Sequence, residues 1–245
     1  MSKETVRLNK YLAMCGLCSR RDADKLIEQG RVTVNGQNAT SGMQVCVEDE
    51  ILVNGKPLKG QEKKVVLAYY KPIGVTCTEK DAHAEKIITR LIDYPIRVTY
   101  AGRLDKDSEG LMILTNDGDL IQAMMRGANC HEKEYIVKTN KEITDVFIQQ
   151  MKSGVYLREL DRTTRECEVS QTGKYTFRIV LTQGLNRQIR RMCKELGYEV
   201  RSLKRIRIMN ITLEQLQTGV YREVKGTELE ALYSGCGLKC PGSVY

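Results

Sequence analysis

The sequence predicts an α+β protein, in which a small helical module precedes a larger domain built on a mostly antiparallel mixed sheet flanked by helices. The chain of 245 residues has room for one small and one larger domain. Strand-like and helical segments do not alternate regularly, and no glycine-rich phosphate loop follows a strand, which argues against a doubly wound parallel sheet. A composition of 41% hydrophobic and 29% charged residues is typical of a chain that folds around a core.

The first module is predicted over residues 6–58. Apolar side chains from Leu8 to Cys15 recur at helical spacing, so the module begins with a helix, which Gly16 ends. Ser19 is placed to cap a second helix. Two short strands should follow, each ended by an Asn-Gly turn signal, over residues 31–34 and 49–53.

A polar, charged segment without periodicity, residues 59–64, is predicted to be a linker to the larger domain at residues 65–232. A tail rich in glycine, residues 233–245, is expected to be disordered. Strands of the larger domain are expected at 65–70, 98–101, 135–139, 176–182 and 205–213. Helices are expected at 83–92, 119–126, 144–152, 186–196 and 227–232.

Nine cysteines accompany a sequence start without a secretory signal, which favours reduced thiols and a cytoplasmic location. No apolar run approaches the ~18 residues that a membrane helix needs. Two cysteine pairs, Cys15/Cys18 and Cys236/Cys240, have spacings that could bind zinc. The first pair lies in a helical pattern and the second in the glycine-rich tail, so we expect structural roles, with no metal and no cofactor.

Positive charge is concentrated late in the chain. The formal net charge is +8, and residues 187–207 alone carry eight basic against two acidic side chains. Localised positive charge is typical of proteins that bind a polyanion, although a solvated helix face would give the same pattern. Twelve tyrosines in a chain without tryptophan could stack on nucleic-acid bases.

The segment from residue 102 to 115 holds the most promising chemistry, with three acidic residues within five positions. Asp105 lies between Arg103 and Lys106, so its carboxylate should stay ionised. An ionised aspartate on a loop beside a sheet could act as a nucleophile or a base. Alternatively the segment is a polar loop in which Asp107 caps a turn.

Five segments together resemble one known family. The pattern RLNKYLA…SRRDADKLIEQGRVTVNG near the start is similar to the S4 RNA-binding domain. The segment GRLDKDSEGL, residues 102–111, resembles the aspartate motif of RsuA-type pseudouridine synthases. Three further segments resemble motifs of that family and occur in the order expected along the chain, and they are KPIG at 71–74, KEY at 133–135 and GLNRQIRRM at 184–192.

The resemblance implies an isomerase that converts a uridine in RNA to pseudouridine. It implies that Asp105 is the essential residue, that Tyr135 contacts the target base, and that Arg190 pairs with Asp105. Lys71, Arg103 and Leu203 would support the site or touch the base. From the residues alone, Tyr135 and Leu203 could instead be ordinary packed side chains, and Lys71 a surface lysine.

The expected partner is a structured stem–loop of large-subunit (23S) rRNA, free or in a pre-ribosomal particle, bound by a monomer without membrane contact. The alternatives are the same reaction on small-subunit rRNA or tRNA, or a non-catalytic RNA-binding or ribosome-assembly factor. Basic side chains and one amide are expected to contact the RNA, and they are Arg7, Lys10, Arg20, Arg21, Lys25, Asn186, Arg187, Arg191, Lys204, Arg205 and Arg207.

Overall fold

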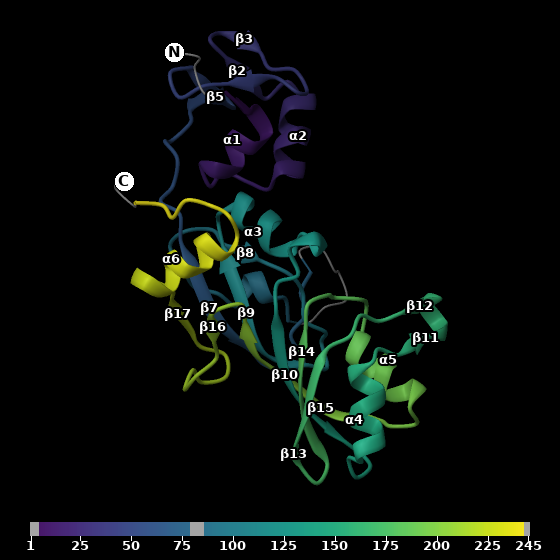
Figure 1. The fold of residues 1–245 in the computed structure, drawn as a ribbon. Coiled ribbons are helices and arrows are strands. Elements are labelled where there is room, and N and C mark those ends of the chain that lie inside the picture. Colours follow the sequence, from purple (N-terminus) through teal and green to yellow (C-terminus); the bar gives the residue numbers. More distant parts are fainter. Residues whose placement is uncertain (1–4, 79–85, 243–245) are drawn as a thin grey trace. The chain divides into compact units, whose positions relative to one another are not determined.

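The computed structural model describes residues 5–78 and 86–242. The chain forms two compact units (Figure 1). The smaller unit comprises residues up to Lys64 together with 95–97 and 116–118, and the larger unit comprises the remainder. The expected α+β class, with a mostly antiparallel mixed sheet in the larger unit, is confirmed.

The smaller unit packs two helices against short strands. Ser19 caps the second helix as predicted, since its Oγ accepts a hydrogen bond from the Asp22 N–H at 3.2 Å. Apolar faces of both helices meet the strands in a core that includes Leu12, Ala23 and Val32, each fully buried. The elements are β1 (Val6–Arg7), α1 (Leu8–Met14), α2 (Arg20–Glu28), β2 (Val32–Val34), β3 (Gln37–Asn38), β4 (Gln44–Val45), β5 (Ile51–Val53) and β6 (Lys56–Pro57).

The larger unit holds the main sheet and four α-helices among its described residues. Its strands are β7 (Val66–Lys71), β8 (Thr99–Tyr100), β9 (Glu109–Thr115), β10 (Lys133–Thr139), β11 (Tyr156–Leu157), β12 (Arg162–Thr163), β13 (Glu168–Gly173), β14 (Thr176–Leu181), β15 (Val200–Ile208), β16 (Ile211–Thr212) and β17 (Tyr221–Glu223). Its helices are α3 (Gly118–Met125), α4 (Asp145–Lys152), α5 (Gln188–Glu195) and α6 (Gly226–Gly235), with 3-10 turns η1 (Ile88–Arg90), η2 (Gly127–Asn129) and η3 (Arg158–Leu160).

The main sheet has the strand order β13-β14-β10-β15-β9-β7-β17. Two further short strands join it, because β8 pairs with β9 and β16 pairs with β15. Every described pairing in it is antiparallel except the one between β9 and β15. This parallel contact joins the two halves of the sheet at its centre (Figure 1). Loops that enter β9 therefore lie beside β15 and β10.

Both faces of the sheet are covered, so β7 is buried along its whole length. Alternate side chains of β7 enter different cores, with Leu67 and Tyr69 in one and Ala68 in the other. Helices α4 and α5 contribute to the first core, and α3 and α6 to the second. The central strands of this sheet are therefore held by packed side chains on both faces.

Gly110 makes the central parallel contact possible. Its φ is 118°, and a Cβ atom at this position would lie 2.2 Å from the carbonyl oxygen of Arg205. Any other residue would push β9 and β15 apart. The glycine in the aspartate motif is thus required for the pairing that fixes the loop just before it.

Several segments of the larger unit differ from the sequence prediction. The sequence does not predict strands β9, β11, β12, β13 and β17. The helix predicted at 83–92 lies partly outside the described residues, with only η1 in its described part. Helix α6 continues to Gly235, beyond the predicted boundary at 232, because Tyr233 is 1% exposed and belongs to the second core. No helix among the residues described is long and apolar enough to cross a membrane.

Candidate active site

A cavity of about 440 Å³ lies in the larger unit, where the loop between β8 and β9 meets β10, β15 and the start of α5. It is lined by Asp105, Tyr135 and Leu203, as well as by both Arg187 and Arg190. The fold thus brings together residues that are up to 98 positions apart in the sequence. This convergence includes the three residues to which the sequence analysis assigned the main chemical roles.

Asp105 lies on the loop that leads into β9, with 38% of its side chain exposed. Two main-chain bonds hold this loop. The Asp105 carbonyl accepts from the Ser108 N–H at 3.1 Å, and the neighbouring Lys106 carbonyl accepts from the Gly74 N–H at 2.7 Å. The carboxylate therefore projects from a braced turn but remains open to a ligand.

Tyr135 and Leu203 lie on adjacent antiparallel strands, β10 and β15, and are 9% and 6% exposed. The ladder between these strands is irregular next to Tyr135, because Glu134 pairs with Arg207 whereas Tyr135 pairs with Arg205. A bulge of this kind bends a strand and re-aims its side chains, and bulges are common beside active sites. Tyr135 and Leu203 both line the cavity and belong to the first core, so they give this side of the cavity an apolar character.

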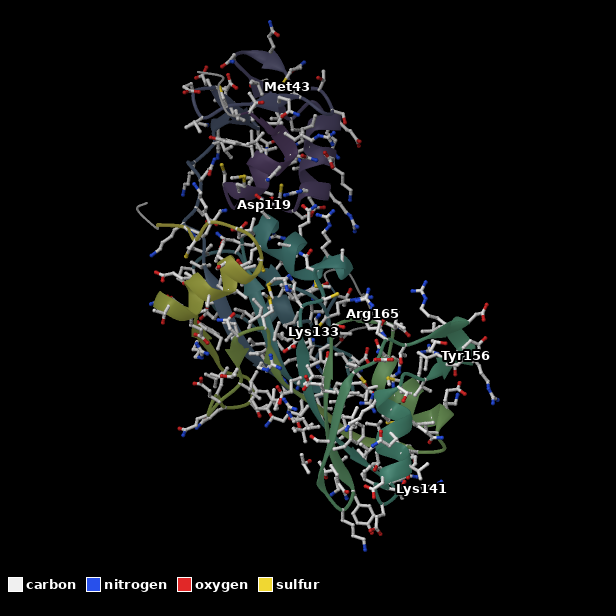
Figure 2. The ribbon with its side chains drawn as sticks, in the orientation of Figure 1. Met43, Asp119, Lys133, Lys141, Tyr156 and Arg165 are labelled. Carbon is white, nitrogen blue, oxygen red and sulfur yellow. The ribbon has the colours of Figure 1, made fainter. Side chains whose placement is uncertain are left out.

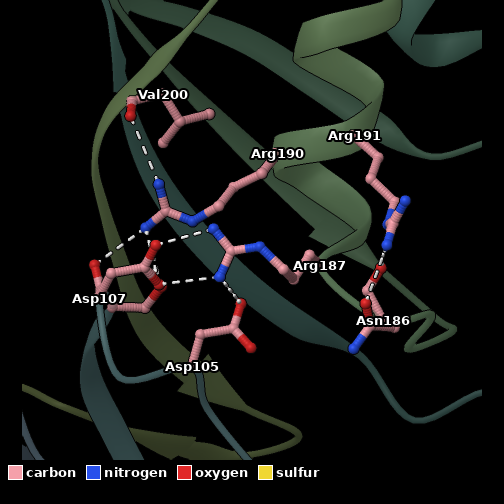
Figure 3. A network of polar contacts seen from close by, with 8 residues as sticks. Asp105, Asp107, Asn186, Arg187, Arg190, Arg191 and Val200 are labelled. Carbon is pink, nitrogen blue, oxygen red and sulfur yellow. Dashed lines mark hydrogen bonds and ion pairs between the residues drawn. The ribbon is translucent and has the colours of Figure 1, made fainter.

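Two arginines hold the far side of the Asp105 loop (Figure 3). Arg187 binds Asp107 with both ends of its guanidinium, at 3.3 Å to Oδ1 and 2.8 Å to Oδ2. The same guanidinium lies 3.6 Å from Oδ2 of Asp105. Arg190 donates from Nη2 to the main-chain carbonyl of Asp107 at 2.9 Å and to Oγ of Ser108 at 3.1 Å.

The arginine that lies next to Asp105 is therefore Arg187, whereas the sequence analysis assigned this pairing to Arg190. The difference arises where α5 begins. Arg187 precedes the helix in a left-handed conformation, with φ of 49°, and this turns its side chain toward the aspartate loop. Arg190, one turn inside the helix, reaches the main chain of the same loop and lies 3.4 Å from Oδ1 of Asp107 (Figure 3).

The charges around Asp107 favour its ionised form. Burial alone would raise the pKa of this carboxyl, but the hydrogen bond from Arg187 and the positive charges of Arg190 and Arg187 outweigh burial and lower the pKa. The hydrogen bond that Arg187 donates to Asp107 in turn raises the pKa of Arg187. The network thus carries fixed charges of both signs at neutral pH.

Lys71 is fully buried and is not a surface lysine. Its ammonium group donates to the carbonyls of Pro72 and Val75, both at 2.9 Å. Burial lowers the pKa of Lys71, despite the nearby acidic groups. These bonds shape the turn whose Gly74 holds the Asp105 loop, so Lys71 reaches the site through the main chain.

Several residues expected to bind RNA have structural partners instead. Arg205 is 3% exposed and donates from Nε to the carbonyl of Leu111 at 2.7 Å, so it cannot present its charge to a phosphate backbone. Arg207 is bound by two glutamates, Glu132 and Glu134. Lys204 lies over the ring of Tyr70, with Nζ 4.8 Å from the ring centroid.

The remaining predicted residues differ in their surroundings. Arg103, expected to support the site or touch the base, and Asn186, expected to contact RNA, are exposed and line the cavity. Arg191 lies outside the cavity lining and is held by Glu159 and Asn186. In the smaller unit, the predicted contacts lie on α1 and α2 or next to them with exposed or half-buried side chains, and they are Arg7, Lys10, Arg20, Arg21 and Lys25.

The cavity also has a wall that the sequence analysis did not anticipate. Met125, His131 and Gln183 line it, and the Nε2 atoms of His131 and Gln183 are buried without a hydrogen-bond partner. Lys133, inside the larger unit in Figure 2, lies on the same face of β10 as Tyr135. Burial and the charge of Arg205 lower the pKa of this lysine. In the sequence, the one indication of this placement is that Lys133 precedes Tyr135 by two residues, a spacing that puts both side chains on the same face of a strand.

No group of three or more metal-binding side chains occurs within residues 5–78 and 86–242. All nine cysteines are free, and Cys15 is buried in the core of the smaller unit. Cys236 and Cys240 pack against the second core of the larger unit. Both cysteine pairs thus have packing roles.

A carboxylate and a tyrosine ring in an open pocket edged by guanidinium groups suit a single nucleotide that leaves the stack of a polyanion. The fold and the site thus define a protein of the class that modifies a base within RNA. The sequence places it further: residues 65–195 match the family model for RNA pseudouridylate synthase, and residues 6–51 match the S4 domain. The chain belongs to the RNA pseudouridylate synthase family and is an isomerase.

Relatives of known sequence agree with this assignment. The chain is 46% identical to the dual-specificity RNA pseudouridine synthase RluF of Escherichia coli K12, over 94% of this chain and 79% of that protein. It is 33% identical to the ribosomal large subunit pseudouridine synthase B of Bacillus subtilis, over 92% and 95% of the two chains. A solved pseudouridylate synthase aligns with a TM-score of 0.68 at 29% identity, covering 93% of this chain and 99% of the other.

Proposed function

We propose that this protein isomerises a specific uridine of large-subunit ribosomal RNA to pseudouridine, with Asp105 as the catalytic residue. The observation that carries the proposal is the position of Asp105, which lines one cavity together with Tyr135 and is braced but only partly buried. The names of the relatives support the RNA class, because one of them is a large-subunit enzyme.

In the proposed reaction the N1–C1′ bond of the uridine breaks, the uracil turns, and a C5–C1′ bond forms. The hydrogen at C5 leaves as a proton and N1 gains one, so the reaction is balanced without an oxidant or reductant. Asp105 assists the cleavage by attack at C1′, by addition at C6 or by removal of the 2′ proton. Each of these routes needs one accessible carboxylate oxygen.

Tyr135 is proposed to stack on the flipped uracil, and Leu203 to pack beside it. Stacking of a base on an aromatic ring contributes ~1–3 kcal/mol, which offsets much of the few kcal/mol needed to unstack the target. Arg187 supplies positive charge next to Asp105, at 3.6 Å. Arg190 holds the loop on which Asp105 stands through Asp107 and Ser108.

The smaller unit is proposed to bind a structured part of the same RNA through the basic residues of α1 and α2. Because phosphate contacts release counterions, binding should weaken steeply as salt is raised. We further propose that the protein acts as a monomer, in the cytoplasm, on free rRNA or on a pre-ribosomal particle. The nine free cysteines agree with a reducing compartment.

The test is release of tritium from RNA that carries uridine tritiated at C5. The wild-type protein should release tritium from a 23S rRNA transcript, and Asp105→Asn should not. Sequencing of pseudouridines in rRNA from cells with and without the gene then locates the target. Failure of the wild-type protein to release tritium from any rRNA or tRNA would favour a non-catalytic RNA-binding factor and contradict the proposal.

A second substrate has one observation in its favour, since the RluF relatives are named as dual-specificity enzymes. We propose transfer RNA as the second RNA class. The tritium assay with bulk tRNA decides this, because release that depends on Asp105 would support dual specificity. Tritium release from rRNA but not from tRNA would contradict the proposal of tRNA as a second substrate and would leave large-subunit rRNA as the only proposed substrate.

A further inference from the structure

We propose that Asp107 is a positioning residue, which holds the guanidinium of Arg187 away from Asp105 and so keeps the catalytic carboxylate free for the substrate. This inference rests on the proposed function of Asp105 and adds a role for its neighbour two residues on. Asp105 and Asp107 both lie within reach of the one guanidinium (Figure 3).

The sharing is unequal. Asp107 takes both ends of the guanidinium, with its closer contact at 2.8 Å. Asp105 has one ion-pair contact at 3.6 Å, which is longer than a hydrogen bond to nitrogen. A bidentate arginine–carboxylate pair is both the stronger and the more directional arrangement. Asp105 thus gains a nearby positive charge but keeps its oxygens available.

The backbone at Arg187 supports a directed role for this side chain. Its φ of 49° lies in the left-handed region, which is uncommon for any residue but Gly, Asn and Asp. Such conformations persist where the surroundings fix them, and they cluster at active sites. The strained residue and the bidentate contact to Asp107 together set where the guanidinium stands.

If Asp107 loses its charge, Arg187 keeps one carboxylate within reach, and that is Asp105. The guanidinium then closes on Asp105 with both ends and occupies the oxygens that the substrate needs. We therefore expect Asp107→Asn to lower kcat by about 10–100-fold, the range in which misplacement of a catalytic group falls. KM for RNA should change little, because Arg187 keeps its charge at the mouth of the cavity.

A double variant separates this role from simple loosening of the loop. Removal of Arg187 as well takes away the guanidinium that lies 3.6 Å from Asp105, so Asp107→Asn/Arg187→Gln should turn over about tenfold faster than Asp107→Asn alone. Arg187→Gln by itself should mainly raise KM. Arg190 keeps its contacts to the Asp107 carbonyl and to Ser108 in all of these variants, and its 3.4 Å ion pair with Oδ1 of Asp107 is lost equally in both asparagine variants, so the comparison between these two isolates Arg187.

The matched control is Glu228→Gln. Glu228 also makes a bidentate pair with an arginine, at 2.6 and 2.7 Å to Arg222, but neither residue lines the cavity. Loss of the same charge there should leave kcat at the wild-type value. Asp107→Glu, which restores the charge, should recover part of the turnover that Asp107→Asn loses, and it covers the case in which the asparagine variant folds poorly.

The measurement is single-turnover release of tritium from 5-tritiated RNA by the full-length protein, after circular dichroism has shown that each variant is folded. A double variant that is as slow as Asp107→Asn, or slower, would overturn the positioning role, as would wild-type turnover in Asp107→Asn. No release by the wild-type protein would overturn the proposed function, and this inference with it. Release by the wild type together with a failed rescue would overturn this inference alone.

Discussion

Two clusters of arginine and carboxylate lie in the larger unit, and they differ in how the charges are shared. At Glu134 one carboxylate serves two arginines, with Arg178 Nε at 2.5 Å from Oε1 and Arg207 Nε at 2.7 Å from Oε2. Only 11% of the Glu134 side chain is exposed. At the mouth of the cavity, by contrast, Asp105 and Asp107 share Arg187, and one carboxylate is left open.

The difference teaches what each arrangement can do. Both oxygens of Glu134 are occupied, so this cluster can only join β10 to its neighbours β14 and β15. Asp105 lies near one positive charge, but hydrogen bonds from the described residues do not occupy both of its carboxylate oxygens. The catalytic role proposed for Asp105 needs such an accessible carboxylate. Both clusters pair arginines with carboxylates. Glu134 and Asp107 each have two arginines within 4 Å, whereas the described contacts give Asp105 one, at 3.6 Å.

The largest expected effect comes from Asp105→Asn. This change keeps the shape of the side chain but removes the charge, so turnover should fall by at least about a thousandfold. Because the carboxylate makes no bond that holds the fold, the thermal midpoint should stay within the error of the wild-type value. Tritium release and thermal melting measure the two outcomes, and a melting point that falls along with turnover would contradict the comparison.

Arg190→Lys is expected to have the second-largest effect. Lysine keeps the charge but cannot reach the Asp107 carbonyl, Ser108 and the Val200 carbonyl together, as Arg190 does. The Asp105 loop should lose its orientation and kcat should fall about 100-fold. Single-turnover kinetics measures this, with Arg222→Lys as a control outside the cavity. Wild-type turnover would show that the Arg190 contacts do not position Asp105.

Glu134→Gln should show the opposite pattern to Asp105→Asn. It leaves Arg178 and Arg207 without their shared carboxylate, at a cost of about 2 kcal/mol in the free energy of unfolding. Turnover at a temperature where the variant is folded should stay within about threefold of wild type. Urea unfolding followed by circular dichroism gives the first value, and a variant of wild-type stability would contradict a structural role.

Acid should erase the difference between wild type and Glu134→Gln. The hydrogen bond from Arg178 and then that from Arg207 lower the pKa of Glu134 against the effect of burial. Because the folded pKa lies below the unfolded value of about 4.3, this group stabilises the fold above that pH and stops doing so as the pH falls through the folded pKa. The unfolding free energies of the two proteins should differ at pH 7 and converge as the pH falls well below 4. A constant gap would argue against the linkage.

Much of this could be predicted from the sequence, for identifiable reasons. The helices of the smaller unit have clear periodicity and a capping serine, and the structure has them within two residues of the expected ends, apart from the first residues of α1. The motifs around Asp105, Tyr135 and Arg190 come together in one cavity. Strand β9 was missed although its apolar run from Leu111 to Leu114 is typical of a buried strand, because the acidic residues just before it favour a loop.

The arrangement of the arginines could not be predicted. Arg187, Arg190 and Arg191 all precede or occupy the first turns of α5, and the residue at which the helix begins decides which of them meets Asp105. A left-handed conformation at an arginine has no signature in local sequence. The burial of Arg205 depends on partners 94 positions away, which periodicity does not register.

The parallel pairing of β9 with β15 has a consequence for how the molecule acquires its activity. It joins Gly110 to Arg205, so a long stretch of chain must be made and folded between them before the contact can close. Until then the aspartate loop lacks its neighbours on β15 and α5. The nascent polypeptide therefore cannot complete the cavity until Arg205 and α5 have been synthesised.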